Sequence, residues 1–312
     1  MRQISLATTA VGLALLVAAC ASATPESGAP SVAPSPSAVP STPPSASTVP
    51  EASPAPSAPG SPASDAADEV LDAALATQAE GTVRYRVDVR SADPDDALPP
   101  QIGSGQVSFG DPAQFRFESE GTPGTVPPSE VIFDGDTLFS RGRDTPYLPE
   151  DTWVSLETKE GTMGRDLVMR QYGDSMLVLV TPLGVTSAER TGDETIGSRG
   201  VTRYVTQVDV SAARPHLPEP LVPAYDARMA NLTSAGAPLT HEVEVWVDSD
   251  GRIARTRYVQ ELQGQDVEAL VITYDFDGYG DPMEAAPPSG AEVLTIEEAQ
   301  QRRLAAETAP PS

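Results

Sequence analysis

Three consecutive segments in the last third of the chain alternate apolar and polar residues and are separated by tight turns. They run from Glu242 to Val247, from Ile253 to Glu261 and from Val267 to Phe276, with Asp-Ser-Asp-Gly and Gln-Gly-Gln between them. Parallel neighbours need a crossover of a dozen residues or more, so strands on such short connections run antiparallel. The sequence therefore predicts a three-stranded meander and excludes a fold built on parallel strands alone.

The same alternation marks the first half of the chain. Val83 to Val89 alternates strictly, which indicates a strand with one buried and one solvent-exposed face. Gln106–Phe109 and Gln114–Glu118 flank a Gly-Asp-Pro turn, and Val131–Phe133 and Thr137–Phe139 flank an Asp-Gly-Asp turn. Turns of this composition join hairpin strands, so these segments extend the antiparallel sheet.

Other segments have apolar residues at helical spacing, and one segment lies between the two halves of the predicted sheet. Asp68 to Gln78 predicts a helix, Gly164–Tyr172 and Asp174–Leu183 predict one or two apolar helices, and Pro218–Leu232 predicts another. Thr186–Val210 predicts a strand or a strand pair. The expected fold class is α+β, with a strongly curved antiparallel sheet and helices packed on its concave face.

Residues 1–19 have the parts of a bacterial lipoprotein signal peptide: a positive start, an apolar core and small residues before a cysteine. The apolar run is too short for a hydrocarbon core of about 30 Å. Cys20 is the single cysteine of the chain and stands where lipoprotein processing attaches diacylglycerol. We expect Cys20 to anchor the protein to the outer face of the cell membrane. The alternative is an ordinary secretory signal cut near Ala21 or Ala23.

Composition divides the rest of the chain. Residues 20–66 are rich in Pro, Ser and Ala, and such a stretch buries too little apolar area to offset the entropy of ordering. We expect this linker to be disordered, residues 67–296 to form one β-sheet domain, and residues 297–312 to form a disordered tail.

The chain carries a formal net charge of −25. So acidic a protein is a poor partner for nucleic acid or for flat docking on anionic lipids. The charge is equally explained by solubility alone.

Residues that carry chemistry are sparse. The two histidines, His216 and His241, lie in no metal-ligand spacing, and no nucleophile elbow, phosphate-binding loop or dinucleotide fingerprint occurs. Asp248-Ser249-Asp250-Gly251 begins like a calcium loop but lacks the closing glutamate. We expect no enzyme activity, no cofactor and no metal site.

Apolar side chains raise a different possibility. A curved sheet capped by Met-containing helices leaves room for acyl chains between the two layers, with residues 174–183 as a mobile lid. The candidate lipid-binding residues are Phe115, Phe117, Phe133, Phe139, Trp153, Met176, Leu177 and Leu179. A simple packed core accounts for the same residues.

Several motifs together resemble a known family. They are the strand and Tyr-Gly turn of residues 272–282, the Ala-Pro-Pro of residues 286–288, the segment 194–204 and the Trp-containing segment 245–252. With the lipidation cysteine and the spacer, this order resembles the LppX/LprG-type lipoproteins of mycobacteria and their actinobacterial relatives, whose fold is akin to LolA and LolB. Lys159 is the one lysine among 20 basic residues, a bias that fits a GC-rich actinobacterial genome.

The resemblance implies a half-open barrel that encloses a hydrophobic cavity for acylated lipids or glycolipids, without catalytic residues. The expected function is that of a cell-envelope lipoprotein that binds or carries such lipids. The alternative is a membrane-tethered protein-interaction module of the same fold with no ligand cavity; the sequence identifies no protein partner.

Overall fold

The computed structural model describes residues 62–308, apart from 95–98, 122–126, 143–144, 146, 159–171, 173–174 and 262–268. The signal peptide, Cys20 and most of the linker lie outside the described residues. So do most of the predicted helix 164–172 and the turn after Glu261.

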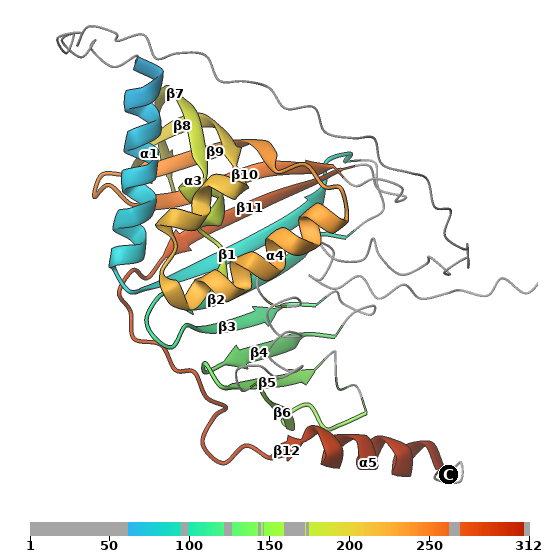
Figure 1. Cartoon of the computed structure of the whole chain (residues 1–312). Helices are drawn as coiled ribbons and strands as arrows, with labels where there is room; N and C mark the ends of the chain where they lie inside the picture. Colours follow the sequence, from blue (N-terminus) through green and yellow to red (C-terminus); the bar gives the residue numbers. More distant parts are fainter. Residues whose placement is uncertain are drawn as a thin grey trace, which may run out of the picture.

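One twelve-stranded sheet organises the chain (Figure 1), in the order β12-β6-β5-β4-β3-β2-β1-β11-β10-β9-β8-β7. All neighbours are antiparallel except β12 and β6. The strands are β1 Thr82–Ser91, β2 Gln101–Ser108, β3 Gln114–Ser119, β4 Ser129–Phe133, β5 Thr137–Gly142, β6 Trp153–Glu157, β7 Val185–Ile196, β8 Arg199–Asp209, β9 Thr240–Asp248, β10 Ile253–Glu261, β11 Ala269–Asp277 and β12 Val293–Thr295. β1 joins the two halves of the sheet, because it pairs with both β2 and β11.

The predicted antiparallel sheet is confirmed, including the meander β9-β10-β11, the hairpins β2-β3 and β4-β5, and the strand pair β7-β8. The strands β6 and β12 were not predicted. Both are short, and β12 reaches β6 from far along the chain, so neither carries a local turn signal.

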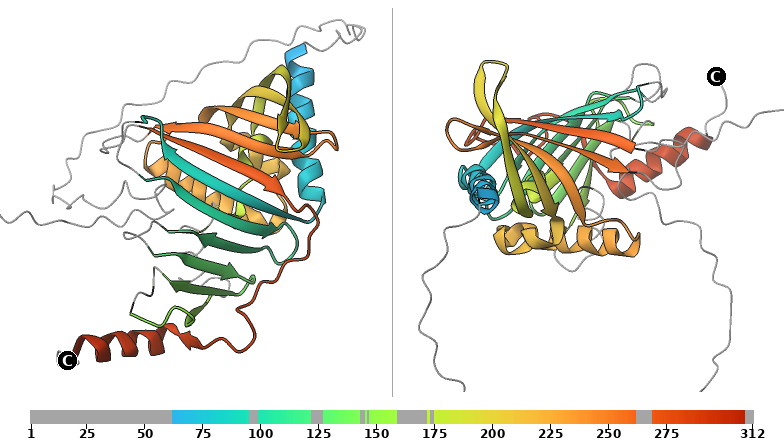
Figure 2. Two further views of the ribbon diagram at one scale, coloured as in Figure 1. Left: turned by 180° about the vertical axis from the view of Figure 1, so that it is seen from behind. Right: turned by 90° about the horizontal axis from the view of Figure 1, so that it is seen from above.

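The helical elements are α1 Pro62–Ala79, α3 Val180–Leu183, α4 Val222–Ser234, α5 Ile296–Thr308 and the 3-10 turns η2 Val210–His216 and η3 Glu219–Leu221. Helices α1 and α4 lie on the same face of the twisted sheet (Figures 1 and 2). Helix α1 packs against β7, and α3 packs against α1 and η2. The main core lies between this helical layer and the sheet.

The predicted helix over residues 174–183 is interrupted: residues 175–176 and α3 are helical, whereas residues 177–179 form a turn between them. Proline has no amide hydrogen and fits only the first turn of a helix. Pro182 therefore sets the start of α3 near residue 180, and Gly184 follows its last residue.

The tail that was expected to lack structure from residue 297 forms α5. Thr295 and Glu298 make a reciprocal capping box: the Glu298 carboxylate accepts from the Thr295 amide at 2.8 Å, and the Thr295 hydroxyl accepts from the Glu298 amide at 3.2 Å. Ala299 is buried against β6 and β12 in a small second core with Leu148, Val154 and Leu294. Capping and this contact hold the helix where composition alone suggested a free tail.

Candidate functional site

A row of aromatic rings crosses the helix-covered face of the sheet from β4 to β11. Alternation along each strand directs these side chains to the same side. Phe115 and Phe133 have ring centroids 5.8 Å apart, and Tyr85 lies 6.3 Å from Phe117. The row consists of Phe133, Phe115, Phe117, Tyr85, Tyr274 and Phe276.

Two glycines of β2 make this row continuous. Gly105 pairs with both Tyr85 and Phe117, and a Cβ atom there would lie 2.5 Å from the Tyr85 ring. A Cβ atom at Gly103 would likewise meet the Phe117 ring. Because β2 has no side chain at these two positions, rings from β1 and β3 close over it and stack.

The segment before α3 covers the aromatic row. Met176, Leu177, Val178 and Leu179 are all buried in the main core. The Tyr85 hydroxyl donates to the Ser175 carbonyl oxygen at 3.4 Å, and the Tyr172 ring lies 6.1 Å from Phe115. The apolar residues 176–179 thus cover the aromatic row.

Six of the eight predicted lipid-binding residues meet in this core: Phe115, Phe117, Phe133, Met176, Leu177 and Leu179. Phe139 and Trp153 do not. Leu138 pairs with Phe133 and is in the main core, so the next residue, Phe139, is directed to the opposite face and is half-buried. A shift of one residue exchanges the faces of a strand.

The opposite face carries a charged cluster in place of an apolar lining. Glu130 is 2% exposed and lies 2.5 Å from the guanidinium of Arg116 and 2.7 Å from that of Arg141. The Arg141 guanidinium is 5.1 Å from the centre of the buried Trp153 ring. Trp153 therefore packs under an ion pair on the face opposite the aromatic row.

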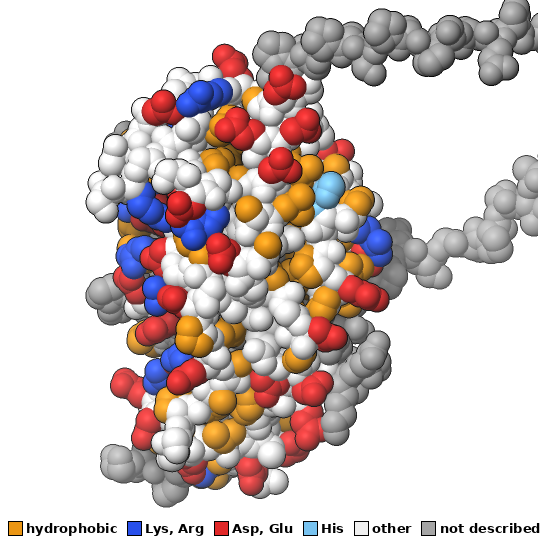
Figure 3. Space-filling model, turned by 90° about the vertical axis from the view of Figure 1, so that its left-hand side faces the viewer, with side chains coloured by type: hydrophobic (Ala, Val, Ile, Leu, Met, Phe, Trp, Pro, Cys, Tyr) orange, Lys and Arg blue, Asp and Glu red, His pale blue; other side chains and the backbone are white. Residues whose placement is uncertain are grey.

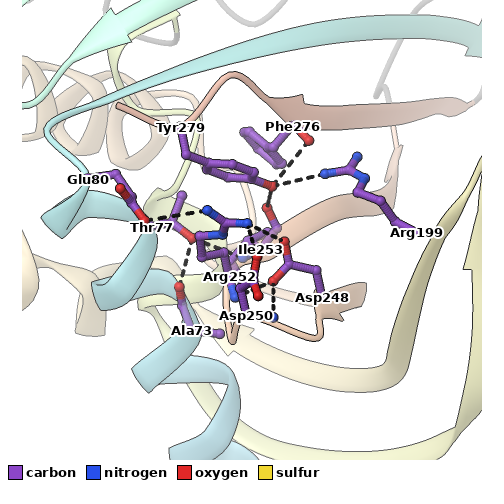
Figure 4. Close-up of polar contacts among 10 residues, drawn as sticks. All are labelled: Ala73, Thr77, Glu80, Arg199, Asp248, Asp250, Arg252, Ile253, Phe276 and Tyr279. Carbon is purple, nitrogen blue, oxygen red and sulfur yellow. Dashed lines mark hydrogen bonds and ion pairs between the residues drawn. The ribbon is translucent and has the colours of Figure 1, made fainter. Parts of the chain in front are cut away.

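One end of the helical layer is fastened to the sheet by a polar network around Tyr279 (Figure 4). The Thr77 hydroxyl on α1 accepts from the Ile253 amide at 2.9 Å and donates to the Ala73 carbonyl oxygen at 2.8 Å. The Arg252 guanidinium lies 4.2 Å from the Tyr279 ring centre and 3.5 Å from the Glu80 carboxylate. Sequence reasoning used Tyr279 only as part of a family motif and did not predict this network.

A pocket of about 520 Å³ lies near the other end of β9 and β10. Its lining comes from α3, the end of α4 and the two strands, and includes Thr181, Val210, Leu232, Ala237, Pro238, His241, Tyr258 and Val259. None of the predicted lipid-binding residues lines it. The sequence carried no local signal for this pocket, because it depends on where the pairing of two strands ends.

Acidic and basic side chains pair with each other beside the pocket. Burial would raise the pKa of Glu244, but hydrogen bonds from Arg257 and Arg203 outweigh that effect and keep its pKa low. Burial, with a smaller effect from the positive charge of Arg228, lowers the pKa of His241. These lowered pKa values favour the neutral form of His241 and the ionised form of Glu244, which is paired with arginine.

Among the described residues, no group of three or more His, Cys, Asp or Glu side chains is placed to hold a metal ion. No helix in the described part of the chain has the length and apolarity needed to cross a membrane. On the face shown in Figure 3, acidic and basic side chains are interspersed with apolar ones and form no single charged patch.

No protein-family model and no curated protein matches the sequence. Among solved structures, LprF from Mycobacterium bovis is 14% identical, with 74% of this chain and 100% of that chain covered and a TM-score of 0.45. LppX from Mycobacterium tuberculosis is 17% identical, with coverages of 72% and 99% and a TM-score of 0.43. The LolA-superfamily protein NE2245 from Nitrosomonas europaea is 13% identical, with coverages of 68% and 92% and a TM-score of 0.26. The solved structures that this chain resembles thus include LprF, the lipoprotein LppX and a LolA-superfamily protein.

Proposed function

We propose that this protein is a cell-envelope lipoprotein that binds or carries an acylated lipid between its sheet and its helical layer, and that it is not an enzyme. The observation that carries the proposal is the aromatic row from Phe133 to Phe276, covered by the apolar segment 176–179. Burial of an acyl chain is favourable by about 25 cal/mol of free energy for each Å² of apolar surface removed from water. Displacement of the cover would expose apolar surface of the aromatic row to such a chain.

The form of the cover supports the same proposal. Residues 177–179 form a turn between helical residues 175–176 and the four-residue helix α3, so this part of the cover has little regular secondary structure to hold it in place. Met176 is unbranched and adapts to ligands of different shape. We propose that this segment is the lid, and that α1, α3 and α4 cover the concave face of a half-open barrel.

The location belongs to the proposal as well. A signal peptide over residues 1–19, a lipid on Cys20 and a linker up to the start of α1 at Pro62 would hold the domain outside the cell membrane. The lipid anchor and a hydrophobic ligand are then the two partners that the chain requires.

The test is mass spectrometry of an organic extract of the full chain after expression in an actinobacterial host. Lipid bound without a covalent bond enters the extract, whereas the lipid on Cys20 stays with the protein. We expect at least one lipid species at a reproducible ratio near one per protein, and far less from an unrelated lipoprotein purified in the same way.

Matched variants connect the ligand to the proposed layer. Leu177→Asp places a charge among buried side chains, whereas Arg86→Asp changes an exposed residue on the other face of β1. We expect the first to lose most of the bound lipid and the second to retain it, with circular dichroism to confirm that both are folded. An empty extract from folded wild-type protein would favour the alternative, a tethered interaction module with a filled core.

A further inference from the structure

The pairing of β9 and β10 stops before either strand ends. Their last paired residues are Val243 and Tyr258. β9 nevertheless begins at Thr240 and remains paired with β8 to that residue, and β10 remains paired with β11 to Glu261. Three residues of β9 and three residues of β10 therefore lie beyond the last pair between these two strands. We call this part of the sheet the β9–β10 notch (residues 240–242 and 259–261).

The pocket of about 520 Å³ lies in this notch and is lined from both faces of the sheet. Tyr258 packs against the main core, and Val210 and Leu232 are buried beside the helical layer. Glu244 and Arg257 belong to the outer face, where their side chains pair at 2.5 Å. Paired strands separate the two faces of a sheet, so a pocket reaches both faces only beyond the end of the pairing.

The notch also has an apolar outer edge. Val259 lines the pocket and is 47% exposed, one of few large apolar side chains with so much exposure in the described part of the chain. Ala237 and Pro238 line the same pocket from the loop after α4. An acyl chain would therefore contact apolar atoms at the edge, at Tyr258 and at Leu232. The rest of the lining is polar and would face the lipid head group; it includes Arg228, Thr240, Glu242, Gln260 and Glu261.

At the opposite end, the same two strands are held together. There the Tyr279 network and the tight turn between β9 and β10 bind α1 to the sheet. Because β9 and β10 are held together at one end and apart at the other, the notch is a built feature of the sheet and needs no change in the fastened end to admit a ligand.

We propose that the β9–β10 notch is a lateral opening through the sheet, through which the acyl chain of a lipid reaches the apolar layer. This inference rests on the proposed function and adds to it the route that the ligand takes. It places the opening between two strands of the sheet, where Thr181 of α3 also lines the pocket.

A disulfide bond that closes the notch tests the proposal. If the pairing continued from Val243 and Tyr258, His241 would face Gln260, so the double variant His241→Cys and Gln260→Cys joins the strands there. A disulfide requires Cα atoms about 4.4–6.8 Å apart, so its formation draws the two strands together. The reference and the variant are both the full chain with Cys20→Ser, which leaves the new pair as the only thiols.

The measurement is the uptake rate of a fluorescent C16 fatty acid by stopped flow. We expect oxidation of the double variant to slow uptake at least tenfold and a reductant to restore the reference rate within twofold. Uptake that is equally fast in the oxidised and reduced forms would overturn the lateral opening and leave the proposed function intact. A reference protein that does not bind the probe would instead count against the proposed function itself.

A second pair of variants requires no disulfide. Val259→Trp fills the outer edge of the notch, whereas Val293→Trp adds the same side chain at a residue of β12 that is 43% exposed. We expect the first to slow uptake at least threefold and the second to leave it within twofold of the reference. Equal rates for the two variants would overturn the proposal.

Discussion

The hydroxyl group of Tyr279 donates a hydrogen bond to the carbonyl oxygen of Ile253 at 2.8 Å, where β10 leaves its turn from β9. The amide of the same Ile253 donates to Thr77 on α1 at 2.9 Å. One residue of β10 is therefore held from both sides, by a residue after β11 and by a residue near the start of the domain.

Replacing Tyr279 with phenylalanine keeps the ring under Arg252 and removes the hydroxyl. We expect the free energy of unfolding to fall by about 1–2 kcal/mol, since the loss of a hydrogen bond to a part-buried carbonyl costs about that much. Urea titration measures the change. Tyr147→Phe, at a residue that is 36% exposed, is the control and should change stability by less than about 0.5 kcal/mol. Equal effects would mean that the hydroxyl of Tyr279 contributes nothing specific.

The two faces of the sheet can be compared by alanine substitution of one phenylalanine on β3 and one on β5. Phe115→Ala empties a site that is fully buried in the aromatic row and should cost about 3–5 kcal/mol. Phe139→Ala, on the opposite and half-buried face, should cost less than half as much. Thermal unfolding of both variants checks the order, and a larger loss for Phe139 would contradict its assignment to the other face.

Gly105 should tolerate no side chain, because a Cβ atom would meet the Tyr85 ring. We expect Gly105→Ala to destabilise the protein by about 1–3 kcal/mol, the usual cost of overpacking. Gly200→Ala is the matched control, since nothing lies within 4 Å of the Cβ position there. Denaturant titration of the pair measures the difference, and similar stabilities would show that the rings yield without cost.

Glu130 lies between Arg116 and Arg141, and its side chain is 3% exposed. Glu130→Gln keeps the shape and removes the charge, so we expect a loss of about 2 kcal/mol, near the value for hydrogen bonds to charged groups. Glu118 is exposed and faces Glu130 across the strands. Glu118→Gln should therefore be neutral or slightly stabilising, because like charges directly opposite each other are unfavourable. Chemical denaturation at low salt checks both signs.

His241 should make stability depend on mildly acidic pH. Its pKa is lowered in the folded protein by burial and by Arg228, so the unfolded chain binds more protons in this range. The contribution is fully present above the unfolded value of about 6.5 and is lost as the pH falls through the folded pKa. We expect His241→Gln to lose less stability than the wild type between about pH 7.5 and pH 5.

The measurement is the free energy of unfolding of both proteins across that interval, and His216→Gln serves as the control histidine. Parallel pH profiles for the wild type and His241→Gln would contradict the assignment.

Local patterns were sufficient to predict most of the sheet. Alternation from Val83 to Val89 and the tight turn at Asp248–Gly251 specify strand and connection within a few residues, so β1 and the β9–β10 hairpin follow from neighbouring residues alone. The capping box of Thr295 and Glu298 is also local. These two residues indicate the start of α5, whereas the composition of the tail suggested that it lacks structure.

Other features depended on contacts between distant segments. Whether Phe133 or Phe139 faces the helical layer follows from strand register, and a shift of one residue reverses the answer. The partner of Tyr279 is fixed only when β10 and α1 meet beside it. By itself the sequence determined an antiparallel α+β chain, because alternation and turns act over a few residues. The tertiary structure alone decided which aromatic rings meet and where β9 and β10 part, because pairing across the sheet depends on the packing of the whole domain.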